Sequence, residues 1–228
     1  EPNVGIVEVP DVRISQLADI VHPDKIQPAT VEFVDIAGLV EGASKGEGLG
    51  NKFLANIRET DAILHVVRCF NDENIVHVSG KIDPLSDIET IHTELILADI
   101  ETLEKAIQRE SKKSKSGDKE SKQLLDIYSK LEGNFDKGKL AINLNLDADE
   151  MNAIKPLCLI TIKPIMFVAN VDEQGFKNKP NLNALKSYAE KMNSLVITIC
   201  AKIESDISEL SDDEKLIFLS EMNLKSLA

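Results

Sequence analysis

Short apolar runs separated by helical patterns constrain the fold of this chain more than any other feature of its sequence. Five runs have the length and the residue types of strands, at residues 4–9, 31–35, 63–68, 165–170 and 195–200. Segments of helical periodicity lie between them, at residues 14–21, about 51–59 and 182–192. Strands that alternate with helices form a largely parallel sheet, so the sequence predicts an α/β fold. The first two runs are equally compatible with an antiparallel pair.

A long uninterrupted helical pattern occupies the middle of the chain. From residue 86 to about residue 107, apolar residues recur at helical intervals without a Gly or Pro to interrupt them. Ser86, followed by Glu89 three residues later, has the pattern of a capping box and predicts the start of this helix. A polar stretch at 111–119 then precedes a second helix that ends near Gly133. Two antiparallel helices joined by a polar tip form a helical hairpin or a short coiled coil.

This hairpin divides the chain into three regions. Residues 1–85 and 156–228 are predicted to form the two parts of one α/β domain, and residues 86–155 the inserted helical hairpin. A helix start is predicted at 147–153 and a closing helix at 212–222. The insert is therefore expected to interrupt the sheet between its third and fourth strands.

Composition and charge exclude several classes of protein. The chain has 26 Lys and Arg against 39 Asp and Glu, so its net charge is −13 and most of its surface would repel nucleic acid. Its apolar runs stay far below the roughly 20 residues of a membrane helix. The cysteines Cys69, Cys158 and Cys200 have neither disulfide-scaffold nor zinc-ligand spacing. We therefore expect a cytoplasmic protein with reduced thiols and without a membrane or DNA partner.

The first candidate site is the sequence Asp35, Ile36, Ala37, Gly38, directly after the second apolar run. In α/β folds, the groups that contact ligands lie at the carboxyl ends of parallel strands. The Asp35 carboxylate can hold a magnesium-bound water there, and Gly38 lets a backbone N–H approach a terminal phosphate because it has no Cβ. The same pattern also arises from an ordinary strand end followed by a turn.

A glycine-rich segment follows at residues 42–51. It contains the four glycines Gly42, Gly46, Gly48 and Gly50, and then opens a helix. Such a composition allows many backbone conformations, and the N-terminus of a helix favours anions. The segment is therefore interpreted either as a flexible surface loop or as a switch that a bound phosphate orders.

Polar groups also follow the fourth and fifth apolar runs. The fourth run ends at Asn170 and is followed by Val171, Asp172 and Glu173, and the fifth ends at Cys200 and is followed by Ala201 and Lys202. Because the carboxyl ends of parallel strands meet at one edge of a sheet, these groups are expected on the same edge as Asp35. This arrangement is the geometry of a nucleotide base pocket.

A close resemblance to a known family covers residues 31–70, with their run GASKGEGLGN. This stretch resembles the Obg-like ATPases, the YchF subfamily of translation-factor-class P-loop GTPases, and the resemblance extends over essentially the whole chain. It implies a Ras-like P-loop NTPase sheet core that hydrolyses ATP with Mg²⁺. Asp35 would then serve the metal ion and Gly38 the γ-phosphate, and the glycine-rich segment would be a switch loop.

The resemblance also implies a preference for ATP over GTP. The guanine-reading motif of such proteins is usually NKxD, whose Asp pairs with guanine. Asn170 keeps the first position here, whereas Val171 replaces the Lys and Glu173 replaces the Asp. A Glu is one methylene longer and does not place its carboxylate where an Asp accepts both guanine N–H bonds. Residues 200–202 fall where the fifth motif of the family gives backbone contacts to the base.

Two departures from the family pattern limit this expectation. Leu39 stands where Ras-like enzymes carry a water-orienting Gln, so slow hydrolysis is expected and the catalytic residue stays unknown. No G-x-x-x-x-G-K-[ST] occurs in the 228 residues, and the P-loop of the family would lie upstream. We therefore expect part of a longer protein, without the P-loop or the C-terminal TGS domain. Such a part would be inactive by itself and would leave backbone groups of its sheet unpaired.

The polar tip of the hairpin is the candidate partner-binding surface. Between residues 109 and 122 it holds six basic residues against three acidic ones, and Lys112, Lys113 and Lys115 are the candidate contacts. The resemblance implies a contact with the ribosome, through rRNA or a ribosomal protein. The tip is equally compatible with an ordinary solvated loop. A second hypothesis for the chain is therefore a non-catalytic interaction module, whereas residues 170–173 disfavour a guanine-specific GTPase.

Overall fold

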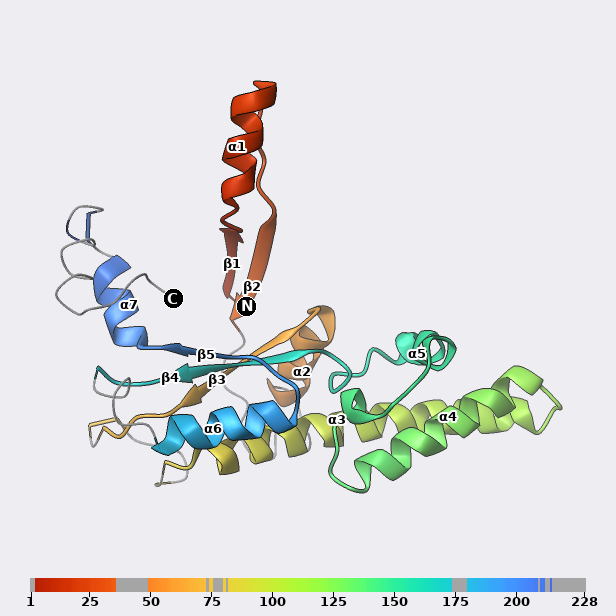
Figure 1. Ribbon diagram of the computed structural model, residues 1–228. Coiled ribbons are helices and arrows are strands. Elements are labelled where there is room, and N and C mark those ends of the chain that lie inside the picture. Colours follow the sequence, from red (N-terminus) through yellow and green to blue (C-terminus); the bar gives the residue numbers. More distant parts are fainter. Residues whose placement is uncertain are drawn as a thin grey trace.

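The computed structural model describes residues 3–35, 49–72, 74–75, 80, 82–173, 180–208, 210–211 and 214 of the chain. Within these residues the strands form two sheets (Figure 1). One is parallel, with the order β3 (Ile63–Arg68), β4 (Ile165–Asn170) and β5 (Val196–Ile199). The other is an antiparallel pair of β1 (Asn3–Glu8) and β2 (Thr30–Asp35). The first two apolar runs therefore pair in the antiparallel manner that the sequence left open.

Helices connect the strands and cover them. In chain order the described helical segments are α1 (Val12–Val21), α2 (Leu49–Glu59), α3 (Pro84–Ser114), α4 (Lys119–Phe135), η2 (Ala141–Asn143), α5 (Ala148–Ile154), η3 (Lys155–Leu157), α6 (Pro180–Lys191) and α7 (Ala201–Ser208). Two of them, α3 and α6, run side by side beneath the parallel sheet in Figure 1. This arrangement gives the sheet one covered face.

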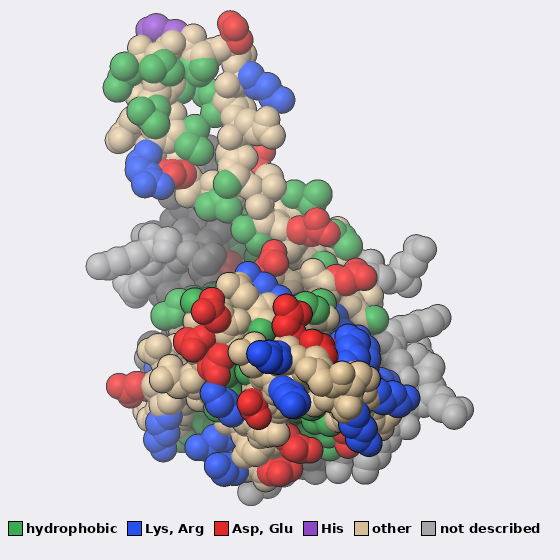
Figure 2. Space-filling view, turned by 90° about the vertical axis from the view of Figure 1, so that its right-hand side faces the viewer, with side chains coloured by type: hydrophobic (Ala, Val, Ile, Leu, Met, Phe, Trp, Pro, Cys, Tyr) green, Lys and Arg blue, Asp and Glu red, His purple; other side chains and the backbone are tan. Residues whose placement is uncertain are grey.

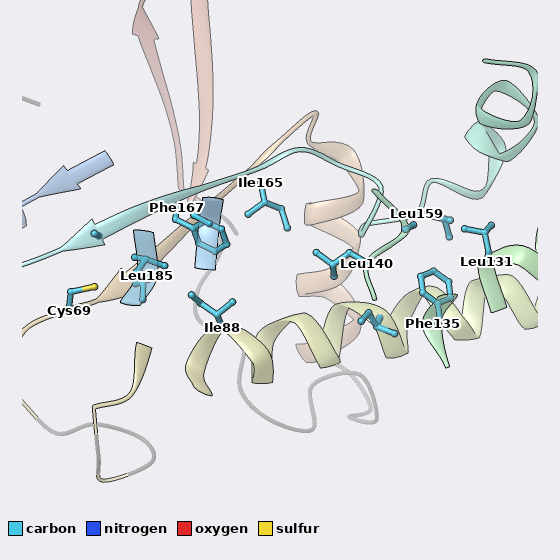
Figure 3. Packing of buried hydrophobic residues seen from close by; sticks show 14 of the residues in the cluster. Cys69, Ile88, Leu131, Phe135, Leu140, Leu159, Ile165, Phe167 and Leu185 are labelled. Atoms are coloured by element: carbon cyan, nitrogen blue, oxygen red, sulfur yellow. The ribbon is translucent and has the colours of Figure 1, made fainter. Parts of the chain in front are cut away.

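The main apolar core lies between that face of the sheet and the two helices. Ile88 of α3, Phe167 of β4 and Leu185 of α6 are fully buried and point toward one another (Figure 3). The opposite face of β3 is open, since Leu64 and Val66 are 41% and 62% exposed. β4 is buried on both faces, and a strand of this kind has a continuous apolar sequence. The strand predicted at 165–170 therefore has the same bounds in the structure.

The helical hairpin predicted from the sequence is formed by α3 and α4, which pack along each other. Leu131 and Phe135 of α4 are buried in the core cluster that includes Leu103 of α3 (Figure 3). The chain reverses at the tip through Gly117, whose φ of +91° suits a glycine. α4 continues two residues beyond Gly133, where the sequence predicted its end.

The predicted start of α3 at Ser86 is wrong. The helix begins at Pro84, and its N-cap is Asp83, whose carboxylate accepts the backbone N–H of Ser86 at 3.3 Å. Pro is well suited to the first helical position, because its φ is preset and its missing N–H would have no partner there. The capping-box pattern of Ser86 and Glu89 therefore lies inside the helix.

The first helix and the antiparallel pair form an arm that projects from the rest of the molecule (Figure 1). Every residue of β1 is exposed, and α1 contains no buried residue. Asp11 caps the start of α1, and His22 ends it with a φ of +46°. The predicted stop of this helix before Pro23 is thus observed as a left-handed cap.

Helix starts near the end of the insert and after β5 complete the fold. Asp147 and Glu150 form a capping box at the start of α5, where the sequence predicted a helix. α7 begins at Ala201, which the sequence did not predict, and the expected closing helix at 212–222 falls outside the described residues except for Glu214. In the part of the chain that is described, no helix has both the length and the apolar character to span a bilayer.

Candidate functional site

The carboxyl ends of β3, β4 and β5 lie at one edge of the parallel sheet. The register aligns Arg68 with Asn170, and Asn170 with Ile199, so the last residues of the three strands are neighbours. The ladder extends one step further, because the N–H of Cys69 donates to the Asn170 carbonyl and the N–H of Val171 donates to the Ile199 carbonyl, both at 2.8 Å. Two of the predicted site segments therefore begin side by side.

A direct contact joins these two segments. The backbone N–H of Ala201, at the start of α7, donates to the side-chain Oδ1 of Asn170 at 3.1 Å. Val171 and Cys200 are buried beside this contact, with 2% and 3% exposure. The structure thus brings Asn170, Val171, Cys200 and Ala201 together as the sequence predicted, with the Asn170 amide tied to the turn that precedes α7.

Two charged side chains lie at the outer rim of this region. The Nζ of Lys202 is 3.2 Å from Oε1 of Glu173, and both side chains are mostly exposed. The Glu173 carboxylate raises the pKa of Lys202 through this hydrogen bond. Glu173 is thus engaged by a cation of the neighbouring segment.

The thiol of Cys69, directly after β3, is buried. Burial raises the pKa of Cys69 to about 11, so the thiol is protonated at neutral pH. The Cys69 thiol is therefore a poor nucleophile.

Asp35 does not lie in the same sheet as Asn170, and the expectation of a shared sheet edge is wrong in this respect. Asp35 ends β2, and the only described partner of β2 is β1. The free edge of β2 and the free edge of β3 have no hydrogen-bonded strand between them in the described residues, so no ladder connects the two sheets. Gly38, Gly42, Gly46 and Gly48 lie outside the described residues, and Gly50 belongs to the first turn of α2.

The described residues hold no dedicated cluster of metal ligands. No group of three or more His, Cys, Asp or Glu suited to a metal ion occurs in the described residues. Mg²⁺ does not need such a group, because it keeps several waters and takes one or two carboxylates together with substrate phosphates. Asp35, exposed at the end of β2, fits the role of such a single ligand.

The hairpin tip is a folded, charged surface. Glu110 is buried and accepts hydrogen bonds from Arg109 at 2.8 Å, Lys113 at 3.1 Å and Ser121 at 2.9 Å. These bonds, that of Arg109 first, lower the pKa of Glu110 to about 2. One of the three predicted contact residues, Lys113, therefore has an intramolecular partner.

The other two predicted contacts, Lys112 and Lys115, are exposed at the end of α3. Figure 2, which views the molecule from the side of the hairpin tip, shows Lys and Arg side chains gathered among Asp and Glu. The tip thus offers cations within a mixed surface rather than a uniformly basic patch.

An open hollow of about 220 Å³ lies on the stem of the hairpin, away from the strand ends. It is lined by Thr102, Lys105, Ala106, Arg109, Pro156 and Leu157. Its two cations would suit an anion, but neither of the base-contact motifs predicted from the sequence reaches it. This hollow could not be predicted from the sequence, because its walls come from α3 and η3, which are distant in the chain.

Sequence reasoning also missed a buried polar network around Asp99. This residue is fully buried in α3 and contacts Arg58 of α2 and Thr161 before β4. The available signal was a carboxylate within the apolar periodicity of a long helix, since a buried Asp requires partners.

Comparisons with known proteins point to one family. A family profile described as "50S ribosome-binding GTPase" matches residues 15–103. The ribosome-binding ATPase YchF of Haemophilus influenzae is 54% identical over 225 residues, which are 99% of this chain and 62% of that protein. The Bacillus subtilis protein of the same name is 51% identical over 228 residues, with 99% and 62% coverage.

A solved structure has the same fold. The structure of the Schizosaccharomyces pombe YchF GTPase matches with a TM-score of 0.82 and 30% identity, over 99% of this chain and 62% of that one. The chain therefore has the P-loop GTPase fold of that protein, and it spans 62% of the length of these relatives.

Proposed function

Because this chain belongs to the YchF family, we propose that it supplies the purine-binding part of a magnesium-dependent ATPase that binds the ribosome. The observation that carries the proposal is the 3.1 Å hydrogen bond from the Ala201 N–H to Asn170 Oδ1. It joins the two segments to which the sequence assigned the base. Residues 1–85 and 156–228 would form the nucleotide-binding domain, and residues 86–155 the inserted hairpin.

The proposed base pocket favours adenine because it lacks a free carboxylate placed to bind guanine. Guanine recognition needs a carboxylate that accepts two N–H groups at once and is free to do so. Glu173 instead accepts a hydrogen bond from Lys202 at 3.2 Å. Its side chain is also one methylene longer than that of the Asp which the NKxD motif has at this position. Val171 would offer a buried apolar wall. Residues 200–202 would contact an adenine edge through backbone groups other than the Ala201 N–H, which Asn170 already accepts.

The phosphate and metal side of the site rests on the resemblance of the sequence. Asp35 would hold the shell of Mg²⁺, and Gly38 would donate its backbone N–H to the γ-phosphate. The bound Mg²⁺ would neutralise charge on the phosphates. Gly42, Gly46, Gly48 and Gly50 would form the segment that the γ-phosphate orders.

The proposed partner surface is the hairpin tip. Lys112 and Lys115 are exposed on it, and the buried pairing of Glu110 with Arg109 and Lys113 fixes its shape. Cations held on a stable tip suit either rRNA phosphates or an acidic ribosomal protein. A ribosomal partner also places the protein in the cytoplasm.

The selectivity of the pocket is tested by competition between ATP and GTP in calorimetry on the full-length protein. We expect wild type to prefer ATP, and the double variant V171K/E173D to shift the preference toward GTP by at least tenfold, because it restores the guanine-reading residues. Glu190→Asp is the matched control, since Glu190 is exposed on α6. If the ratio of ATP affinity to GTP affinity is the same in the double variant as in wild type, this base pocket is refuted.

The basic tip also supports a second candidate function, an interaction module that holds no nucleotide. Calorimetry with ATP separates the two candidates when this chain and the full-length protein are compared. Saturable ATP binding by the full-length protein supports the ATPase. A folded full-length protein that pellets with ribosomes but binds no ATP supports the module.

A further inference from the structure

One arginine connects the helix after the glycine-rich segment to the hairpin. Arg58, in the last turn of α2, donates from Nη2 to the Ala98 carbonyl at 3.1 Å and to Thr102 Oγ1 at 3.0 Å. From Nη1 it donates to the Cys158 carbonyl at 2.9 Å and lies 3.4 Å from Asp99 Oδ1. Its planar group therefore bonds at once to α3 and to the segment that follows η3, which a Lys cannot reproduce.

The carboxylate that faces this arginine is itself tied to the chain before β4. Asp99 has no exposed surface, and it accepts the backbone N–H of Ile160 at 2.9 Å and that of Thr161 at 2.8 Å. The Thr161 hydroxyl adds a third bond at 2.7 Å. Burial raises the pKa of Asp99, and these bonds and the charge of Arg58 oppose that rise.

The end of α2 is held by a second cation from the same segment. Lys163 is nearly buried, and its Nζ donates to the carbonyls of Ile57 at 2.9 Å and Arg58 at 2.8 Å, and also to that of Thr60. These are carbonyls at the C-terminus of a helix, where a cation is favourable. The C-terminal end of α2 is thus fixed to the chain that leads into β4.

The buried apolar side chains described for α2 belong to a small second cluster. The buried members of this cluster are Leu54, Ile57, Leu95, Ala98 and Ile160. They come from the three segments that the polar network also joins, and they lie apart from the main core. The described contacts of α2 therefore combine this apolar cluster with the hydrogen bonds of Arg58.

We propose that Arg58 is a positioning residue that couples α2 to the hairpin, so that the affinity of the hairpin tip for its partner depends on the bound nucleotide. The proposal rests on the function proposed above. The glycine-rich segment leads directly into α2, and α3 continues from Asp99 to Lys112 without a break, a rise of about 20 Å. The bonds of Asp99 to Ile160 and Thr161 also hold the chain that leads into the strand ending at Asn170. One network therefore joins the end of α2, the stem of the hairpin and the chain that leads into β4.

The coupling is measured as a ratio of two affinities in the full-length protein. The dissociation constant for ribosomes is determined in the presence of a non-hydrolysable ATP analogue and in the presence of ADP. We expect a ratio of at least fivefold in wild type and a decrease of at least threefold in that ratio for Arg58→Lys. Thr102→Val, which removes one acceptor, should lower the ratio less, and Arg13→Lys on the exposed arm should leave it unchanged.

The outcomes separate this inference from a structural role and from the proposed function. A ratio that stays at the wild-type value in Arg58→Lys and Thr102→Val overturns the coupling, even where the melting temperature falls. A wild-type protein that binds ATP and ribosomes with a ratio of one overturns the coupling but leaves the proposed function intact. A wild-type protein that binds neither overturns both.

Discussion

At the scale of single residues, two histidines lie in an aromatic cluster beneath the sheet. The ring of His65 on β3 is 6.0 Å from that of His92 on α3 and 5.7 Å from that of Phe167. Tyr188 of α6 is 3.3 Å from Nδ1 of His92, whereas Nε2 of His92 has no hydrogen-bond partner in the described structure. Burial lowers the pKa of each histidine to about 4, with a further decrease at His65 from the nearby His92.

This cluster predicts a loss of stability in mild acid. The unfolded histidines bind protons near pH 6.5 and the folded ones only near pH 4, so their contribution is complete above about pH 6.5 and is lost as the pH falls toward 4. Each imidazole should lower the free energy of unfolding by about 2 kcal/mol when the pH falls from 7 to 5. Urea unfolding over this range should show a shallower pH dependence for His92→Asn than for wild type.

The matched control for this experiment is His22→Asn. His22 is exposed and has a φ of +46°, which Asn tolerates better than most residues. Its variant should follow the pH dependence of wild type. Equal slopes for His92→Asn and wild type would contradict the assignment of the acid sensitivity to this cluster.

The positions of residues were predictable from the sequence where they depend on neighbours in the chain. Asn170 and Ala201 lie at the ends of apolar runs, so their positions at strand ends could be derived. In the structure the Ala201 N–H donates to Asn170 Oδ1 at 3.1 Å. The role of Asp99 could not be derived, because its partners Ile160 and Thr161 lie 61 and 62 residues away. Such pairing appears only when α3 packs against the chain before β4.

At the scale of elements, helices were predicted more reliably than their ends. The periodicity of α3 is continuous over its apolar face, whereas its start is decided by a local choice between two capping patterns. Asp83 with Pro84 forms the actual start, and Ser86 with Glu89 offers a similar pattern one turn later. Sequence pattern alone does not rank the two, because both satisfy the rules for a helix N-terminus.

The two caps make opposite predictions for stability. Asp83→Ala should decrease the free energy of unfolding by about 1 kcal/mol, because it removes the acceptor for the Ser86 N–H. Ser86→Ala should leave it nearly unchanged, since Ser86 is exposed within the first turn and its side chain is not the cap. Urea unfolding of both variants measures the difference, and a larger effect for Ser86→Ala would contradict the assignment of the cap.

The hairpin tip has a prediction of its own. Lys112→Glu with Lys115→Glu should abolish the pelleting of the full-length protein with ribosomes at moderate salt, because two exposed cations become anions. The control is Lys137→Glu with Lys139→Glu, an equal charge change on exposed residues just beyond the other end of α4. If the two double variants pellet with ribosomes to the same extent, the tip is not the surface that binds the partner.

At the scale of the whole molecule, the alternation of strands and helices was enough to predict an α/β fold. The parallel order of β3, β4 and β5 follows from crossovers through helices, which the sequence shows directly. The placement of β2 does not follow, because strand pairing across a sheet edge is not encoded in the residues between the strands. Within the described residues, Asp35 therefore ends a two-stranded sheet that no ladder joins to β3, contrary to the expectation of one shared edge.

The central claim is that residues 170–173 and 200–202 form one purine site. Amide hydrogen exchange of the full-length protein, with and without ATP and Mg²⁺, tests it most directly. The account predicts that ATP slows exchange at both segments together, and leaves exchange at the hollow lined by Lys105 and Arg109 unchanged. Saturable ATP binding that protects the hollow, or any other region, and leaves both segments at their unbound rates would contradict the account.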